Sequence, residues 1–370
     1  MLVNLNNDDV LEFKRLNEIM KYNTMFLNIV SNYINFHDIE INDKLIKRFK
    51  KEVNVNNKEA FYHLFYSFFI DELKEKDKEV MDSYLRKSLT CLKINDYFNN
   101  HYNLRINATN KKYKNWAFKN DSFKSFQGFI FGETQVDEIN YFLETPSFGF
   151  FEKQYSYLAV LENNREWMTI TPNEINTMKE PIEKAFGNVL TIGLGLGYFA
   201  YMTSLKENVN KVTIIEKDSN VIELFKETIL PSFEFKEKIE IINEDAFTFL
   251  QHNNLHEYNY VFVDIWHDVS DGLFLYLDFK AIEDEYQVSF NYWIENEILL
   301  LLRKIILRLI NESYLQIDSL NVDTSNKQLD EVYKRIYNLL NNIQITSYYD
   351  IYKLLKKDNL QILAKYINRR

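Results

Sequence analysis

The spacing of apolar residues changes along the chain, from a helical pattern near the N-terminus to a strand pattern beyond about residue 146. Over residues 1–130 the apolar positions recur mostly at helical spacing. The clearest apolar face comprises Phe61, Leu64, Phe65, Phe68, Phe69 and Leu73. A face of this kind could line a pocket, but it is more typical of a helix that packs on a core. We therefore expect a helical N-terminal domain over residues 1–145.

A β-hairpin is predicted directly after this domain. Residues 155–161 have a strand-like composition and residues 166–171 alternate between apolar and polar side chains, with two asparagines between the segments. Pro172 then stands at a typical helix start, and the helix should continue to about Phe186. Pro181 lies inside that helix and can kink or split it.

Four short apolar segments alternate with helical segments after this hairpin. The predicted strands are 188–192, 211–215, 238–242 and 260–263. The predicted helices between them are 198–205, 219–229 and 246–250. This rhythm indicates an α/β fold with a doubly wound, Rossmann-like parallel sheet, which we place in a domain over residues 146–290. No later strand is recognisable after residue 272, so residues 291–370 are expected to form a helical extension.

Glycines gather where the first of these strands meets its helix. Four of the eight glycines in the chain fall between residues 187 and 197, and Gly193, Gly195 and Gly197 form a G-x-G-x-G sequence. Glycine allows a tight turn and lets a ligand approach the backbone. The nicotinamide motif G-x-G-x-x-G fails because residue 198 is Tyr. An S-adenosyl ligand is favoured over NAD, and a turn that only tightens the packing is the alternative.

Acidic residues follow the next two strands. Glu216 ends the second strand, where a carboxylate can accept both ribose hydroxyls; an exposed residue at the strand end is the alternative. Asp245 ends the third strand and can reach an adenine amino group, with the backbone N–H of Ala246 at a ring nitrogen. Asp245 is also a typical helix N-cap, and it can serve both purposes.

The end of the fourth strand carries a second group of reactive side chains, Asp264, Trp266, His267 and Asp268. In doubly wound sheets, ligands bind at the carboxyl ends of the strands. A carboxylate there can bind a cationic amine, and a histidine can act as a base near neutral pH. Asp264 is the strongest catalytic candidate, with His267 and Asp268 beside it. Trp266 can line the substrate pocket, although surface exposure of His267 and simple packing of Trp266 are the alternatives.

The segments VLTIGLGLGYFA, VTIIEKDSNVIELF, IEIINEDAFTFL and YNYVFVDIWHD resemble, in this order, class I S-adenosylmethionine-dependent methyltransferases. Within that superfamily they look most like the spermidine synthase branch, over about residues 150–270. The resemblance implies that the three glycines hold the amino-acid end of the ligand, Glu216 the ribose, and Asp245 with Ala246 the adenine. The preceding hairpin lies where that branch carries its N-terminal β-element. Glu174 lies near the position of that branch's substrate-side acid.

Three features of the sequence depart from the pattern of these families. Thr191 replaces the acid that methyltransferases usually carry two residues before the first glycine, and Leu196 and Tyr198 flank Gly197 where spermidine synthases carry an acid. The second Asp of the fourth-strand motif follows Asp264 by four residues instead of three.

Composition and charge argue against several other classes of protein. The net charge of −10 argues against general binding of nucleic acid. Residues 111–124 mix Lys with aromatics, a composition that single-strand binding surfaces share, but we expect a solvated loop there. One cysteine, Cys91, excludes an intramolecular disulfide. No signal peptide, membrane span or metal-ligand spacing is recognisable, so we expect a cytoplasmic protein.

The sequence therefore predicts an S-adenosylmethionine-dependent methyltransferase that acts on a small molecule. An aminopropyltransferase that uses decarboxylated S-adenosylmethionine and a polyamine is the alternative enzyme. A non-catalytic nucleotide-binding or scaffold protein is the alternative of a different class. The helical additions at both ends could also form a homodimer interface.

Overall fold

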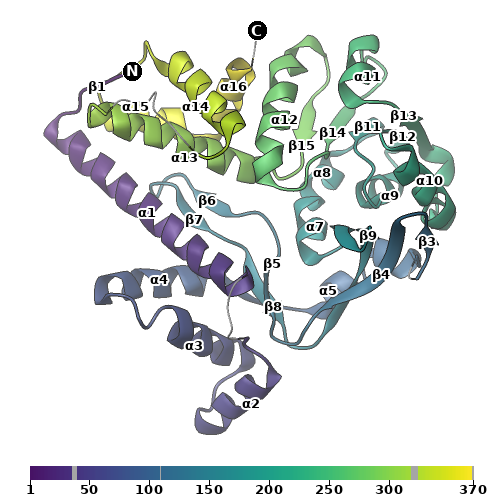
Figure 1. Cartoon of the computed structure of the whole chain (residues 1–370), viewed down its shortest axis with the longest axis horizontal. Coiled ribbons are helices and arrows are strands. Elements are labelled where there is room, and N and C mark those ends of the chain that lie inside the picture. Colours follow the sequence, from purple (N-terminus) through teal and green to yellow (C-terminus); the bar gives the residue numbers. More distant parts are fainter. Residues whose placement is uncertain (36–39, 109, 318–323, 369–370) are drawn as a thin grey trace. The chain divides into compact units, whose positions relative to one another are not determined.

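The computed structural model describes residues 1–35, 40–108, 110–317 and 324–368 (Figure 1). The chain divides into two compact units. One unit is Ile19–His252, and the other combines Met1–Glu18 with Asn253–Arg370. The domain boundaries expected after residues 145 and 290 remain a prediction.

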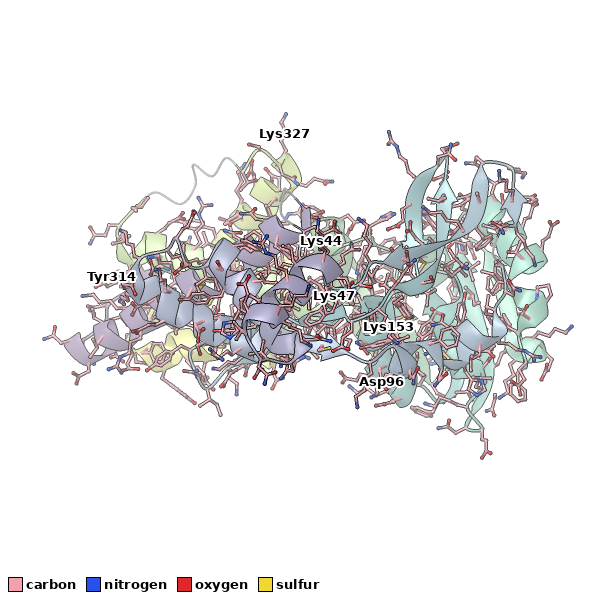
Figure 2. The ribbon with its side chains drawn as sticks, turned by 90° about the horizontal axis from the view of Figure 1, so that it is seen from below. Lys44, Lys47, Asp96, Lys153, Tyr314 and Lys327 are labelled. Atoms are coloured by element: carbon pink, nitrogen blue, oxygen red, sulfur yellow. The ribbon has the colours of Figure 1, made fainter. Side chains whose placement is uncertain are left out.

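Among the described residues up to Ser88, the regular elements are four helices and a two-residue strand, β1 (Leu2–Val3). The helices are α1 (Asn7–Asn35), α2 (Asp43–Glu52), α3 (Asn57–Phe69) and α4 (Glu75–Ser88). Phe61, Leu64 and Phe65 of α3 are buried in one hydrophobic cluster, so the predicted packing role of this face is confirmed. On α2, Ile46 is buried while Lys44 and Lys47 are exposed (Figure 2). This amphipathic pattern explains why these segments fold as helices.

Strands appear from residue 89 onward, so the expectation of a mostly helical chain up to residue 130 is wrong in its last third. Short helices α5 (Ile94–Phe98) and α6 (His101–Arg105) are followed by β3 (Lys112–Tyr113) and β4 (Trp116–Phe123). A three-stranded sheet has the order β2-β8-β5, and two further strands pair with each other. Their bounds are β2 (Leu89–Leu92), β5 (Gly128–Ile130), β6 (Gln135–Asp137), β7 (Leu143–Thr145) and β8 (Phe148–Phe151). The aromatic excess hid these strands, because phenylalanines and tyrosines occur at both strand and helix spacings here.

The predicted hairpin is confirmed as β9 (Tyr155–Glu162) and β10 (Arg165–Thr169). Asn163 and Asn164, with φ of 48° and 65°, form its two-residue turn, the conformation of the tight type I′ hairpin. Strand β4 pairs antiparallel with β9, giving the sheet order β10-β9-β4-β3. The lysine-rich segment that we expected to be a loop is thus largely strand, because β9 pairs with β4 along its whole length and β3 pairs with β4.

The helix predicted over residues 172–186 is split into α7 (Pro172–Thr177) and α8 (Lys179–Lys184). The break falls at Met178, and Pro181 lies in the first turn of α8, where its missing N–H costs no helical bond. The Lys206 ammonium group donates to the carbonyl oxygens of Ile182, Glu183 and Ala185 at 2.6, 2.7 and 2.6 Å. These bonds cap the end of α8.

Three parallel strands of the Ile19–His252 unit have the order β13-β12-β11. They are β11 (Gly187–Ile192), β12 (Val209–Glu216) and β13 (Ile239–Asn243), connected by α9 (Tyr198–Ser204) and α10 (Ser219–Thr228), with α11 (Ala246–His252) after β13. Short 3-10 turns lie at Leu230–Ser232 and Lys236–Lys238. This βαβαβ arrangement, with its 3-2-1 strand order, is half of a doubly wound sheet, which confirms the predicted fold class.

The other unit continues the alternation with β14 (Tyr260–Val263), α12 (Val269–Ile282) and β15 (Phe290–Tyr292), the two strands being parallel. Strand β15 is a fifth β-α-β strand that we did not expect, because its three residues are too short to show a period. A 3-10 turn at Glu283–Glu285 precedes it. Among the described residues, the only later strand is β16 (Gln344–Ile345), which pairs with β1.

The predicted helical extension consists of α13 (Glu295–Tyr314), α14 (Lys327–Leu340), α15 (Tyr348–Leu355) and α16 (Lys357–Ile367). No helix in the described ranges is both long and apolar enough to span a bilayer. A buried ionic network joins this extension to α12 and β15. The Glu283 carboxylate bonds the Lys280 ammonium group at 2.6 Å, accepts from the Tyr292 hydroxyl at 2.7 Å and pairs with Lys365 of α16 at 3.0 Å.

Candidate functional site

The glycine turn between β11 and α9 has the tight backbone conformation that its sequence predicts. Gly193, Gly195 and Gly197 have φ values of 103°, 51° and 70°. These are left-handed conformations that side chains with a Cβ rarely adopt. A Cβ at Gly197 would also lie 2.4 Å from a ring carbon of Phe225. Glycine is therefore required here both for the turn and for close packing.

The backbone N–H groups of this glycine loop (residues 193–197) bond mostly within the chain. Gly193 donates to the carbonyl of Ile215 at 2.9 Å, and Gly197 donates to the carbonyl of Leu194 at 2.8 Å. The N–H of Leu194 donates to the Glu216 carboxylate at 3.3 Å. These bonds fix the loop against the end of β12.

Glu216 lies at the carboxyl end of β12, as predicted. Its carboxylate is half-buried and accepts from the backbone N–H of Asp218 at 2.8 Å as well as from Leu194. Burial raises the pKa of Glu216 above its ordinary value, and the two backbone bonds act in the opposite direction. The structure thus brings Glu216 into direct contact with the glycine loop, while ribose binding by Glu216 remains a prediction.

Met168 of β10 is a loop contact that the sequence analysis missed. Its Sδ accepts from the N–H of Leu196 at 3.2 Å. A Cβ built on Gly195 would lie 2.6 Å from that sulfur and 2.8 Å from the Met168 methyl carbon. The β9–β10 register shifts between Glu166 and Met168, so a β-bulge precedes this contact. Nothing in the local sequence distinguishes Met168 from an ordinary strand residue.

Glu174, the predicted substrate-side acid, is buried in α7 with 6% of its surface exposed. Tyr198, which begins α9 directly after the loop, has a pKa raised to about 12, first by burial and then by the charge of Glu174. Tyr102 of α6 is affected in the same two ways, and its hydroxyl donates to the carbonyl of Leu196 at 2.6 Å. Glu174, Tyr102 and Tyr198 therefore form a polar cluster beside the glycine loop, to which the segment before the predicted hairpin contributes Tyr102.

Asp245 is the N-cap of α11. Its Oδ1 accepts from the backbone N–H groups of Phe247 and Thr248 at 3.0 and 3.1 Å, and its side chain is exposed. Ala246, the first residue of the helix, is buried. The capping alternative is thus realised, while adenine binding by Asp245 and Ala246 remains a prediction.

Asp264 follows β14 directly in the second unit. Burial raises the pKa of Asp264 to about 7, so its carboxyl group can exchange a proton near neutrality. Trp266 is 4% exposed, and its indole ring packs against Gly272 and stacks near the ring of Tyr292, with 6.5 Å between ring centroids. The packing alternative for Trp266 is therefore realised.

His267 and Asp268 form the N-terminal cap of α12. Asp268 Oδ1 accepts from the backbone N–H of Ser270 at 2.7 Å, and Asp271 accepts from the N–H of Asp268 at 3.0 Å, which is a reciprocal capping box. The exposed His267 ring lies 3.4 Å from Asp271 Oδ2. These bonds give both residues a structural role, and their catalytic role remains a prediction.

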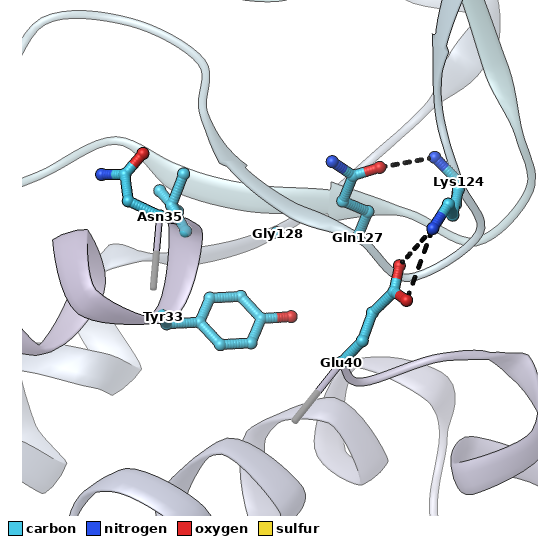
Figure 3. A pocket seen from close by; sticks show the side chains of 7 residues that line it. Tyr33, Asn35, Glu40, Lys124, Gln127 and Gly128 are labelled. Carbon is cyan, nitrogen blue, oxygen red and sulfur yellow. Dashed lines mark hydrogen bonds and ion pairs between the residues drawn. The ribbon is translucent and has the colours of Figure 1, made fainter. Parts of the chain in front are cut away.

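Two other features contain none of the predicted site residues. A cavity of about 300 Å³ lies between the end of α1 and the turn before β5, and its Lys124 and Glu40 are paired with each other at 3.1 Å (Figure 3). In the lysine-rich segment, Lys114 bonds Asn220 at 2.7 Å and Glu223 at 3.3 Å, both on α10. Lys114 is therefore engaged in anchoring the β3–β4 turn to α10.

Comparison with known proteins supports the resemblance for part of the chain. Residues 175–283 match the family model of the spermine/spermidine synthase domain. Among solved structures, the crystal structure of spermidine synthase from Thermotoga maritima aligns with 15% sequence identity and a TM-score of 0.29. The alignment covers 41% of this chain and only 60% of that chain. No curated protein sequence matches.

Proposed function

We propose that this protein is an aminopropyltransferase that uses decarboxylated S-adenosylmethionine and an amine acceptor. The observation that carries this proposal is the spermine/spermidine synthase domain match over residues 175–283, which contains the glycine loop, Glu216 and Asp264. The match favours aminopropyl transfer over the methyl transfer that we first expected from the sequence.

On the cofactor side, the loop and Glu216 supply a half-buried carboxylate in contact with a glycine turn. This arrangement suits a nucleoside whose ribose hydroxyls donate to Glu216 while its sulfonium tail lies along the loop. Asp245 and Ala246 are assigned to the adenine. Glu174, a buried carboxylate beside two tyrosines, is suited to an ammonium group of the substrates.

In the proposed reaction, the acceptor nitrogen attacks the aminopropyl carbon bonded to the sulfonium sulfur. The carbon–sulfur bond breaks, methylthioadenosine leaves, and the new secondary ammonium group loses a proton. We assign amine binding and proton acceptance to Asp264, because a carboxyl group with a pKa of about 7 can do both near neutral pH. We assign supporting roles at the carboxyl end of β14 to Trp266, His267 and Asp268.

A non-catalytic nucleotide-binding or scaffold role is the second candidate. It is favoured by the capping bonds of Asp268 and Asp245 and by Leu196 and Tyr198, which flank Gly197 where the enzymes carry an acid. The helical additions could form a homodimer interface under either of the two candidate functions.

The test is to incubate the protein with decarboxylated S-adenosylmethionine and a diamine and to measure methylthioadenosine by liquid chromatography. We expect product only when both substrates are present, and a large loss of turnover in Asp264→Asn. Formation of S-adenosylhomocysteine from S-adenosylmethionine would support methyl transfer instead. Absence of turnover, with no rise in melting temperature from either cofactor or from methylthioadenosine, would contradict both enzymes and favour the scaffold role.

A further inference from the structure

The thioether of Met168 covers the middle of the glycine loop. Its Sδ accepts the N–H of Leu196 at 3.2 Å, and its sulfur and methyl group fill the space that a Cβ on Gly195 would need. The bulge after Glu166 precedes Met168 in a strand that otherwise pairs regularly with β9. Bulges of this kind commonly redirect one side chain beside a binding site.

This contact limits what the loop can offer a ligand. The N–H groups of Gly193, Leu194, Leu196 and Gly197 all donate to acceptors within the chain. A ligand carboxylate needs such donors, whereas an ammonium group needs acceptors. Glu174 beside the loop is an acceptor when it is ionised, and a thioether is a weak one. The surroundings of the loop therefore suit a tail that ends in an ammonium group alone.

We propose that Met168 is a specificity-determining residue that keeps a carboxylate away from the Leu196 N–H. This inference rests on the proposed function, since it assumes that an S-adenosyl nucleoside binds at the loop. A carboxylate-bearing tail would have to displace the thioether or lose its hydration against an apolar methyl group without gaining a donor. The decarboxylated tail has no such group and incurs no such cost.

The experiment measures dissociation constants by calorimetry for S-adenosylmethionine, decarboxylated S-adenosylmethionine and methylthioadenosine. Met168→Ala uncovers the Leu196 N–H, and Met168→Gln keeps the length of the side chain but adds N–H donors. Both variants should strengthen S-adenosylmethionine binding relative to the decarboxylated form by about tenfold, the effect of one hydrogen bond to a charged group. Met168→Leu is the matched control, and its apolar cover should preserve the original preference.

Methylthioadenosine binding tests the proposed function separately from the role of Met168, because this nucleoside lacks the tail that Met168 would face. Its affinity should be the same for all four proteins. An unchanged ratio between the two cofactors in both Met168→Ala and Met168→Gln, with methylthioadenosine still bound, would overturn the role of Met168 and leave the proposed function intact. If methylthioadenosine does not bind the unmodified protein, the proposed function fails and this inference fails with it. If Met168→Ala does not fold, Met168→Gln still decides.

Discussion

Glu216→Gln should weaken nucleoside binding while leaving the protein folded. The carboxylate accepts the N–H groups of Leu194 and Asp218 at 3.3 and 2.8 Å, and the amide oxygen of Gln can retain one acceptor in the same place. What the variant loses is the negative charge that would accept two ribose hydroxyls. Hydrogen bonds to a charged group contribute about 1.5–3 kcal/mol, so the dissociation constant should rise about 10- to 150-fold.

Calorimetry with methylthioadenosine measures this change, and Glu223→Gln is the matched control. Glu223 is a carboxylate of α10 that pairs with Lys114, so the same substitution there should leave the dissociation constant unchanged. Because burial raises the pKa of Glu216, the affinity of the unmodified protein should also fall as the pH drops through that pKa. Glu216→Gln should show no such dependence. Equal dissociation constants for folded Glu216→Gln and the unmodified protein would remove Glu216 from the site.

Three further predictions concern stability and can be checked by urea unfolding. Gly197→Ala should lower the unfolding free energy by about 2–4 kcal/mol, because φ is 70° and the new methyl group would meet Phe225; a loss below about 1 kcal/mol would contradict the steric argument. Lys206→Met should lower the unfolding free energy by about 2–3 kcal/mol, because it removes three hydrogen bonds to carbonyl oxygens. The control Lys211→Met removes an exposed ion pair and should lower it by less than about 1 kcal/mol. For Asp264, the pKa of about 7 in the folded chain exceeds the ordinary value of 3.8, and each pKa unit corresponds to about 1.4 kcal/mol. The unfolding free energy of the unmodified protein should therefore fall by about 3–4 kcal/mol more than that of Asp264→Asn as the pH rises from 4 to 8; parallel pH profiles would refute the raised pKa.

The parts of the fold that could be predicted are those with a strong local signal. The hairpin over residues 155–169 was marked by a segment of strand-like composition, an alternating segment and an Asn-Asn turn between them, and β11 to β14 were marked by apolar segments at βα spacing. The segment over residues 110–151 could not be predicted in the same way. Its strands are short and rich in aromatics, and β4 is a strand because β9 pairs with it along its length. The pattern of β9 does not show which other segment pairs with it, so the strand character of β4 depends on a contact between distant segments.

In the candidate site, too, some residues could be predicted from the local sequence and others could not. The sequence by itself determined the glycine turn and the acid at the end of β12, because a left-handed turn requires glycine and a strand end is visible locally. Only the tertiary structure decided that Met168 covers Gly195, that Tyr102 bonds the carbonyl of Leu196, and that Asp268 caps α12. These contacts depend on distance and direction in space, and a side chain separated from the loop by 28 or 94 residues carries no local mark of that contact.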